Sequence, residues 1–291
     1  MSYPNQISST PKTTAKGTKY HEVEVHPFGV PDMMLMLVPD SVAAGARVVV
    51  VICAHGSGGT EQTVNSENMA ASRDALLDRG YVVLSAFAHD RAWSNDDALD
   101  DYERVYLYAA QQWSISDVLF HGQSMGGLTL AVLYAQRRVP NVRAVAIVDG
   151  AVSLAAAFEH PAHRGHIRAA YGINGSGSDY AVKTAGHDAC LRPVGDFTES
   201  RVYLWASYED TSTPRAQHAD PFWDRYHRYA VEMTLQGGTG PHLDPTHYQP
   251  RVLMDFYDRA MGVRPTLIHH IQKRYRVGAD RRLYELRPAT S

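Results

Sequence analysis

The chain has 291 residues, of which 44% are hydrophobic and 20% are charged, enough apolar material for one sizeable core. Its formal net charge of −3 excludes a strong overall attraction to nucleic acid or to an anionic membrane surface. No apolar run approaches the roughly 20 residues that a membrane-spanning helix needs, and residues 1–19 contain no apolar segment typical of a secretory signal. These features predict a cytoplasmic protein without a membrane span.

The chain opens with a polar arm, residues 1–19, which we expect to be extended and too polar to bury itself. Strands and helices then alternate up to about residue 262. Segments with the pattern of strands lie at 20–26, 32–38, 47–54, 81–86, 115–120, 143–148, 201–206 and 231–235. Helical patterns lie at 61–78, 96–113, 125–138 and 246–261. This order predicts an α/β fold with a mostly parallel sheet and helices on both faces.

The alternation fails between residues 150 and 200, and we interpret residues 151–199 as a small lid insertion. Its Ala-rich stretch at 151–158, together with Tyr171 and Tyr180, suits either an acyl pocket or ordinary packing.

Three lid histidines, at positions 160, 163 and 166, have a spacing that raises the question of a metal site. We expect Pro161 and Gly165 to break the helix that would align them. No carboxylate or cysteine is interleaved, so we favour a polar lid surface and predict neither a metal nor a cofactor.

The motif Gly122-Gln123-Ser124-Met125-Gly126 lies between a predicted strand and a predicted helix. A G-x-S-x-G motif in this context places its serine on a sharp turn with the hydroxyl exposed. The structural alternative is a tight turn without chemistry. We favour Ser124 as a nucleophile.

A serine nucleophile generates an oxyanion, which needs N–H donors arranged in advance. Met125, the residue after the nucleophile, supplies one predicted donor. The sequence His55-Gly56-Ser57-Gly58-Gly59 follows a buried strand and supplies the second, for which we favour Ser57 with Gly58 as the alternative. A plain glycine turn is the structural alternative, and a phosphate loop is disfavoured because no Lys-Ser/Thr follows.

The serine also needs a histidine as base and an acid that orients the histidine. Asp210 follows the strand at 201–206 and is the favoured acid, with Glu209 and Asp149 as alternatives. His242 lies in a glycine-rich loop after the last strand and is the favoured base. His247 is the alternative, although it falls in the first turn of the last predicted helix and would point inward less easily.

At these residues the chain resembles the α/β-hydrolase superfamily, in particular its serine esterase and lipase-like members. The matching pieces are AHGSGG, HGQSMGG, SYEDTSTP and GGTGPHLDP, and the resemblance extends from about residue 20 to 262. It implies an eight-stranded, mostly parallel sheet, no cofactor, and ester cleavage through an acyl-enzyme. Two features depart from the pattern: Pro241 stands where a second glycine is more usual, and the lid matches no subfamily.

The resemblance leaves several functions open. A serine at the turn argues against dienelactone-hydrolase-like enzymes and dehalogenases, which use cysteine and aspartate. Peptidases, thioesterases and acyltransferases share the same triad, so they remain alternatives to an esterase acting on a small-molecule, lipid or glycan ester.

A different class of function is suggested by the two ends of the chain. Residues 263–291 carry seven arginines and lysines against two acids, and 271–277 and 282–287 alternate like the strands of a hairpin. The alternative is a solvated basic tail. With the N-terminal arm, this tail would suit a homo-oligomer, a larger assembly, or a structural protein that retains a hydrolase fold. An esterase displayed on a larger particle would combine both readings.

Overall fold

A computed structural model describes residues 2–30, 32–263, 274–277 and 283–286. A nine-stranded sheet forms its centre, in the order β1-β2-β3-β5-β4-β6-β7-β8-β9. The strands from β4 to β9 pair in parallel, whereas β1, β2 and β3 join the edge beyond β5 through antiparallel pairs. The strands are β1 Gln6–Thr13, β2 Lys19–Val25, β3 Met34–Pro39, β4 Arg47–Ala54, β5 Val82–Ala86, β6 Ser114–Gln123, β7 Val142–Val148, β8 Arg201–Ser207 and β9 Glu232–Gly238.

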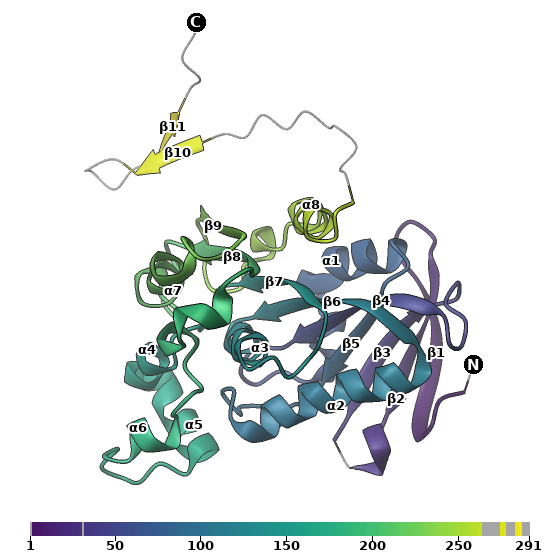
Figure 1. The fold of residues 1–291 in the computed structure, drawn as a ribbon, viewed down its shortest axis with the longest axis horizontal. Helices are drawn as coiled ribbons and strands as arrows, with labels where there is room; N and C mark the ends of the chain where they lie inside the picture. The colour runs from purple at the N-terminus through teal and green to yellow at the C-terminus, as the bar shows by residue number, and fades with distance from the viewer. Residues whose placement is uncertain (1, 31, 264–273, 278–282, 287–291) are drawn as a thin grey trace, which may run out of the picture.

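Helices cover both faces of the sheet (Figure 1). The α-helices are α1 Glu67–Asp78, α2 Asp96–Gln112, α3 Met125–Ala135, α4 Leu154–Glu159, α5 Pro161–Tyr171, α6 Tyr180–Lys183, α7 Ala219–Tyr226 and α8 Pro250–Ala260. Short 3₁₀ turns lie at Pro27–Gly29, Glu61–Asn65, Ala189–Leu191, Val194–Phe197, Arg215–Gln217 and Pro245–His247. No helix among the described residues combines the length and apolar character that crossing a membrane takes.

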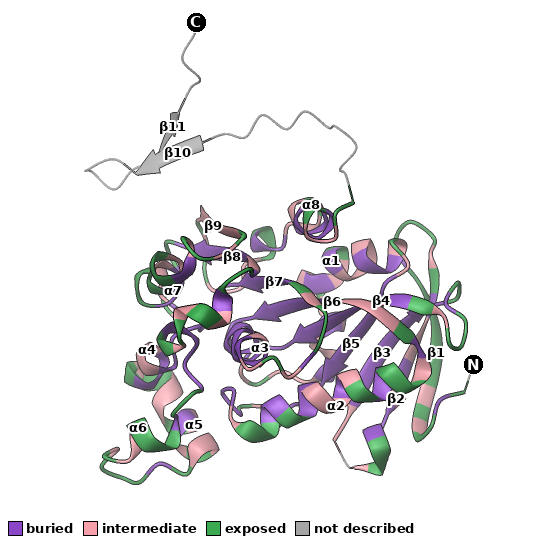
Figure 2. Cartoon of the chain, in the orientation of Figure 1, coloured by how far each residue is buried: buried purple, intermediate pink, exposed green. Residues whose placement is uncertain are grey.

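The sheet separates two apolar cores, because successive side chains of a strand point to opposite faces. Val50 and Ile52 of β4 belong to the core beneath α2 and α3, while Val51 and Cys53 belong to the core beneath α1 and α8. Figure 2 shows the central strands buried along their length. The continuous β-branched run of β4 is therefore explained by its burial on both faces.

The N-terminal arm contributes a strand that the periodicity did not predict. Gln6–Thr13 pairs antiparallel with β2, and its residues remain mostly exposed, as expected from their polarity. Tyr3 and Thr14, on either side of the strand, are buried. The sheet consequently has nine strands, where eight were expected.

The segment between β7 and β8 folds into short helices, α4, α5 and α6, which project beside α7 (Figure 1). The expected break occurs at Pro161, because α4 ends at Glu159 and α5 begins at Pro161 with His160 between them, whereas the expected break at Gly165 is wrong. Pro161 occupies the first turn of α5, where its missing N–H costs nothing, and the helix continues through Gly165 to Tyr171.

At the C-terminus, Arg274–Val277 (β10) pairs antiparallel with Leu283–Leu286 (β11). The connecting residues of the predicted hairpin, 278–282, and the rest of the basic tail at 264–273 and 287–291 lie outside the described residues.

Candidate active site

Ser124 lies at the sharp turn between β6 and α3. Its backbone has φ 50° and ψ −123°, outside the regions that residues with a side chain normally occupy. The motif's glycines make this turn possible: a Cβ on Gly122 would lie 2.7 Å from the Gly126 carbonyl oxygen, and one on Gly126 would overlap the Ala54 carbonyl. The close approach of three chain segments thus explains the G-x-S-x-G spacing.

An imidazole contacts the serine hydroxyl. His242, in the loop after β9, places Nε2 2.9 Å from Ser124 Oγ, although 118 positions separate the two residues in sequence. The ring is partly accessible, with 21% of the side chain exposed, whereas Ser124 is only 7% exposed. The geometry suits proton transfer from the hydroxyl to the ring.

Asp210 completes a continuous chain of hydrogen bonds. Its Oδ2 lies 2.7 Å from His242 Nδ1, and its Oδ1 accepts the amides of Ser212 and Thr213 at 2.8 and 2.9 Å. Burial by itself would raise the pKa of this carboxyl group. The hydrogen bond and charge of His242, with the donors of Thr213, outweigh burial and lower the pKa to about 2. Asp210 is therefore ionised at neutral pH.

The alternative acids and base have other positions. Glu209 accepts the Gly240 amide at 2.9 Å and lies beside the histidine loop. Asp149 and His247 contact each other, with Asp149 Oδ2 2.7 Å from His247 Nδ1. His247 lies in the 3₁₀ turn before α8 and is buried, so it is not the ring that contacts Ser124.

The predicted oxyanion loop lies next to the serine. A Cβ on Gly56 would lie 3.2 Å from Ser124 Cβ, and Gly58 has φ +84°. The amides of Ser57 and Gly58 donate to no acceptor among the described residues, and the Met125 amide, at the first position of α3, has no acceptor within its helix. The N–H groups of Ser57, Gly58 and Met125 are thus without a hydrogen-bond acceptor in the part of the chain that the structure describes.

His163, one histidine of the predicted lid, lies close to the hydrogen-bonded chain. His163 places Nε2 3.2 Å from the Ser212 carbonyl oxygen, and its ring lies 4.9 Å from that of Trp93 and 4.7 Å from that of His160. Burial lowers the pKa of His163, which favours the neutral ring.

The two tyrosines of the predicted lid contact neighbouring residues. Tyr171 donates to the Trp93 carbonyl at 2.8 Å. The rings of Tyr180 and Phe158 are 4.3 Å apart. Both contacts are compatible with ordinary packing.

Within the described residues, two groups of side chains are close enough to share an ion, and neither contains His160, His163 or His166. One group is Asp149, Asp210 and His242, whose atoms are engaged in the hydrogen bonds above. The other is Asp32, His89 and Asp101, where Arg104 already lies 2.5 Å from Asp101 and 3.5 Å from Asp32. Ion pairing accounts for this second group without a metal.

Two polar side chains at this site were not singled out from the sequence. The Thr213 hydroxyl lies 2.7 Å from Asp210 Oδ2, and its position three residues after the acid is a signal for such a contact. His218 is buried and accepts the Ser153 amide through Nδ1, and burial lowers its pKa to about 4. No sequence pattern marks His218, because its partner lies 65 positions away.

Comparison with known proteins gives the fold. No family model matches the chain, and a search of curated proteins found no similar sequence. Solved structures do match. Est1E from Butyrivibrio proteoclasticus has a TM-score of 0.60 and 15% identity, over 83% of this chain and 99% of that one. An S-formylglutathione hydrolase from Agrobacterium tumefaciens has a TM-score of 0.62 and 14% identity, over 89% and 97%.

Peptidases are similar as well. A prolyl endopeptidase has a TM-score of 0.62 and 14% identity, and the match covers 89% of this chain but 39% of the peptidase. With such low identities these likenesses establish the fold alone. The expected fold class is confirmed: the chain has the α/β-hydrolase fold.

Proposed function

We propose that this chain is a serine hydrolase that cleaves carboxylic esters through an acyl-enzyme intermediate. The observation that carries the proposal is the continuous chain of contacts from Ser124 Oγ through His242 to Asp210. A serine hydroxyl alone is a weak nucleophile, and this arrangement supplies both a base and an acid that orients the base. The esterases among the structural neighbours support the same reaction class.

In the proposed mechanism, Ser124 Oγ attacks the ester carbonyl carbon while His242 Nε2 takes the hydroxyl proton. The amides of Met125 and Ser57, with Gly58 as the alternative donor, stabilise the resulting oxyanion. The intermediate then breaks the bond to the alcohol, which leaves with the proton from His242. Water, deprotonated by the same ring, releases the carboxylic acid and restores the serine.

The proposal predicts that Ser124→Ala lowers the turnover of p-nitrophenyl acetate by at least about a thousandfold, because the nucleophile is lost. Ser116→Ala is the matched control. Ser116 lies on the same strand, and its hydroxyl donates to Val48 O. Both variants should keep the wild-type thermal melt to within a few degrees. Unchanged turnover by Ser124→Ala would remove the proposed function.

A fluorophosphonate probe separates this proposal from a structural protein that retains the fold. The probe should label the wild-type chain at Ser124, located by mass spectrometry, and should not label Ser124→Ala. A folded wild-type chain that stays unlabelled favours the structural role. A panel of matched esters, thioesters and peptides then distinguishes an esterase from a thioesterase or a peptidase.

A further inference from the structure

A second acid–imidazole pair lies beside the proposed triad. Asp149, directly after β7, and His247, just before α8, are 2.7 Å apart, and both side chains have 0% exposure. The His247 ring stacks on Trp205 with 3.6 Å between ring centroids. Neither side chain forms a hydrogen bond with Ser124 among the described residues, so the proposed mechanism leaves this buried pair without a role.

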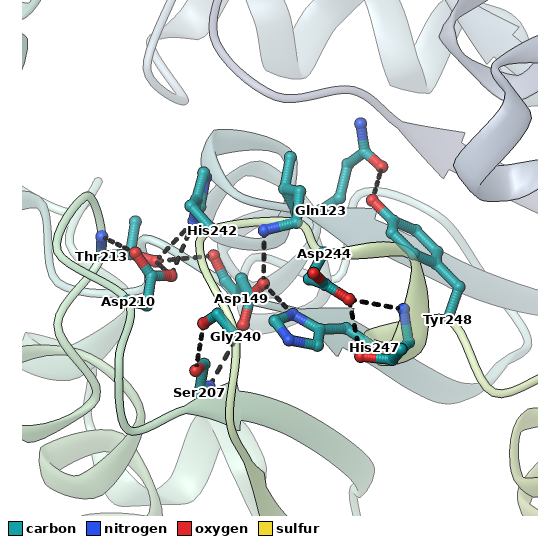
Figure 3. A network of polar contacts seen from close by, with 12 residues as sticks. Gln123, Asp149, Ser207, Asp210, Thr213, Gly240, His242, Asp244, His247 and Tyr248 are labelled. Atoms are coloured by element: carbon teal, nitrogen blue, oxygen red, sulfur yellow. Dashed lines mark hydrogen bonds and ion pairs between the residues drawn. The ribbon is translucent and has the colours of Figure 1, made fainter.

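The pair holds the loop that carries His242 on both sides of that residue. Figure 3 shows Asp149 and His247 joined by a dashed line next to this loop. Asp149 Oδ2 accepts the Leu243 amide at 2.7 Å, and His247 Nε2 lies 3.0 Å from the Thr239 carbonyl oxygen. Leu243 itself has φ +56°, a conformation that is unfavourable for a leucine and needs support from its surroundings. The two contacts therefore fix the loop three residues before His242 and one residue after it.

Protonation follows from the same contacts. A carbonyl oxygen can only accept, so His247 Nε2 must carry a hydrogen that it donates to Thr239. His247 Nδ1 and Asp149 Oδ2 then face each other at hydrogen-bond distance, 2.7 Å. Burial and the charge of Asp210 raise the pKa of Asp149, against the hydrogen bonds from His247 and Leu243.

The pairing with His247 also keeps Asp149 from competing with Asp210 for the hydrogen bond with His242. One oxygen of each carboxyl group and a ring nitrogen of His242 all lie within 4.8 Å of one another. An unpaired Asp149 carboxylate would offer His242 a second acceptor and would repel Asp210. The partnership with His247 directs Asp149 toward the loop backbone and leaves Asp210 to orient the imidazole.

We propose that Asp149 and His247 are positioning residues, which act as one unit to hold the imidazole of His242 in line with Ser124 Oγ. This inference rests on the proposed function of Ser124 and His242. It concerns neither substrate binding nor the overall stability of the fold, so its consequences should be visible in the chemical step.

The test compares Asp149→Asn with Asp258→Asn in the full chain. Asp258 is another buried acid, which pairs with Arg79, the residue directly after α1, at 2.7 Å. Asp149→Asn should lower kcat for p-nitrophenyl acetate about ten- to a hundredfold and leave KM within about twofold, because a shift of about 1 Å in a catalytic group has this effect. Fluorophosphonate labelling should slow by the same factor. Asp258→Asn should keep both rates even where it lowers the melting temperature.

His247→Gln tests the same unit from the other side and should lower kcat in the same range. The double variant Asp149→Asn/His247→Gln should be no slower than the slower single variant, since residues that act as a unit are not additive. Wild-type kcat in a folded Asp149→Asn or His247→Gln chain would overturn the inference, as would multiplicative losses in the double variant.

The wild-type chain provides a readout that does not depend on any variant folding. Hydrogen exchange should show the Leu243 amide strongly protected, because the buried carboxyl group of Asp149 accepts it. Free exchange there would also overturn the inference. Loss of activity in Ser124→Ala, together with normal activity in Asp149→Asn, would leave the proposed function standing while the positioning role fails.

Discussion

Asp210 shows how a residue can be almost completely buried and still ionised. Its side chain is 2% exposed, yet two backbone amides, a hydroxyl and an imidazole face its two oxygens. These donors favour the charged form by more than burial disfavours it. The free energy of unfolding should therefore change with pH in a definite direction, over the range in which Asp210 titrates.

The folded pKa of Asp210, about 2, lies below its ordinary value of 3.8. The ionised group therefore stabilises the fold above about pH 4, and this contribution is lost as the pH falls toward 2. Asp210→Asn should lower the free energy of unfolding by about 2 kcal/mol at pH 7, and the deficit should shrink by about 1 kcal/mol at pH 3. Urea unfolding at both pH values measures it.

Asp224→Asn, at an exposed acid on α7, controls for the loss of one charge. A deficit of Asp210→Asn that stays constant between pH 7 and pH 3 would contradict this account. The same variant should also lose about a thousandfold or more in kcat at every pH, because the imidazole would no longer be held in the productive tautomer.

At the residue scale, the sequence identified the candidate nucleophile, acids and bases, but it left alternatives open for the acid and the base. Ser124 was identified because its glycine spacing is a local requirement of the turn. Asp210 and Asp149 both follow buried parallel strands, and both reach the same edge of the sheet. The two acids differ in the imidazole that each contacts, His242 for Asp210 and His247 for Asp149. These contacts depend on the path of the loop after β9, which local sequence patterns do not predict.

At the scale of elements, β6 supports the serine and also carries a buried histidine. His121 pairs across the sheet with Cys53 of β4 and Ala146 of β7, and it is 3% exposed. Its Nδ1 has no hydrogen-bond partner among the described residues, and burial lowers its pKa to about 4. The neutral ring is therefore the form that the folded strand accommodates.

Protonation of His121 should accordingly oppose folding. Between about pH 6.5 and pH 4 the unfolded chain binds this proton and the folded chain does not, so stability falls as the pH falls through this range. His121→Leu should remove up to about 3 kcal/mol of the loss that the wild-type chain suffers between pH 7 and pH 4. Urea unfolding across this range measures the difference.

His21→Leu, at a half-exposed ring on β2, is the matched control for the loss of one imidazole from a strand. Parallel stability curves for the wild-type chain and His121→Leu over this range would show that burial does not hold His121 neutral.

Strands and helices were predicted well where burial produces a regular pattern of hydrophobic residues, and poorly where it does not. The run at 47–54 became β4 with the same bounds, because both of its faces are buried. β1 escaped prediction because an edge strand with nearly all of its side chains exposed has no alternation to detect. α4, α6 and α7 were missed because they are short. α5 was missed because it carries histidines and arginines and buries only Ile167, which leaves no apolar face to detect.

At the scale of the whole molecule, the candidate site and the N-terminal strand lie far apart in the sheet. Ser124, Asp210 and His242 follow β6, β8 and β9, whereas four strands separate β1 from β6. Several contacts attach the first residues to the body: Tyr3 packs on Trp113 with 5.7 Å between ring centroids, Tyr108 donates to the Pro4 carbonyl, and the His26 amide donates to the Asn5 carbonyl. The reactivity of Ser124 and the attachment of the N-terminal arm should therefore be separable by experiment.

Deletion of residues 2–13 should destabilise the fold and leave the site intact. Losing the buried Tyr3 ring removes about 2 kcal/mol of apolar burial. It also exposes the backbone groups of β2 at a new sheet edge, which promotes association between chains. The truncated chain should melt at a lower temperature and aggregate at a lower concentration, as measured by light scattering, while fluorophosphonate labelling of Ser124 proceeds within about twofold of the wild-type rate.

Tyr3→Ala separates the two contributions, because it removes the buried ring and leaves β1 paired with β2. It should lower the melting temperature to a similar extent without raising aggregation, since the edge of β2 stays covered. A loss of labelling on truncation, at a temperature where the chain remains folded, would mean that the edge strand and the site are coupled through the sheet. The site would then depend on the arm, against the separation that the strand order implies.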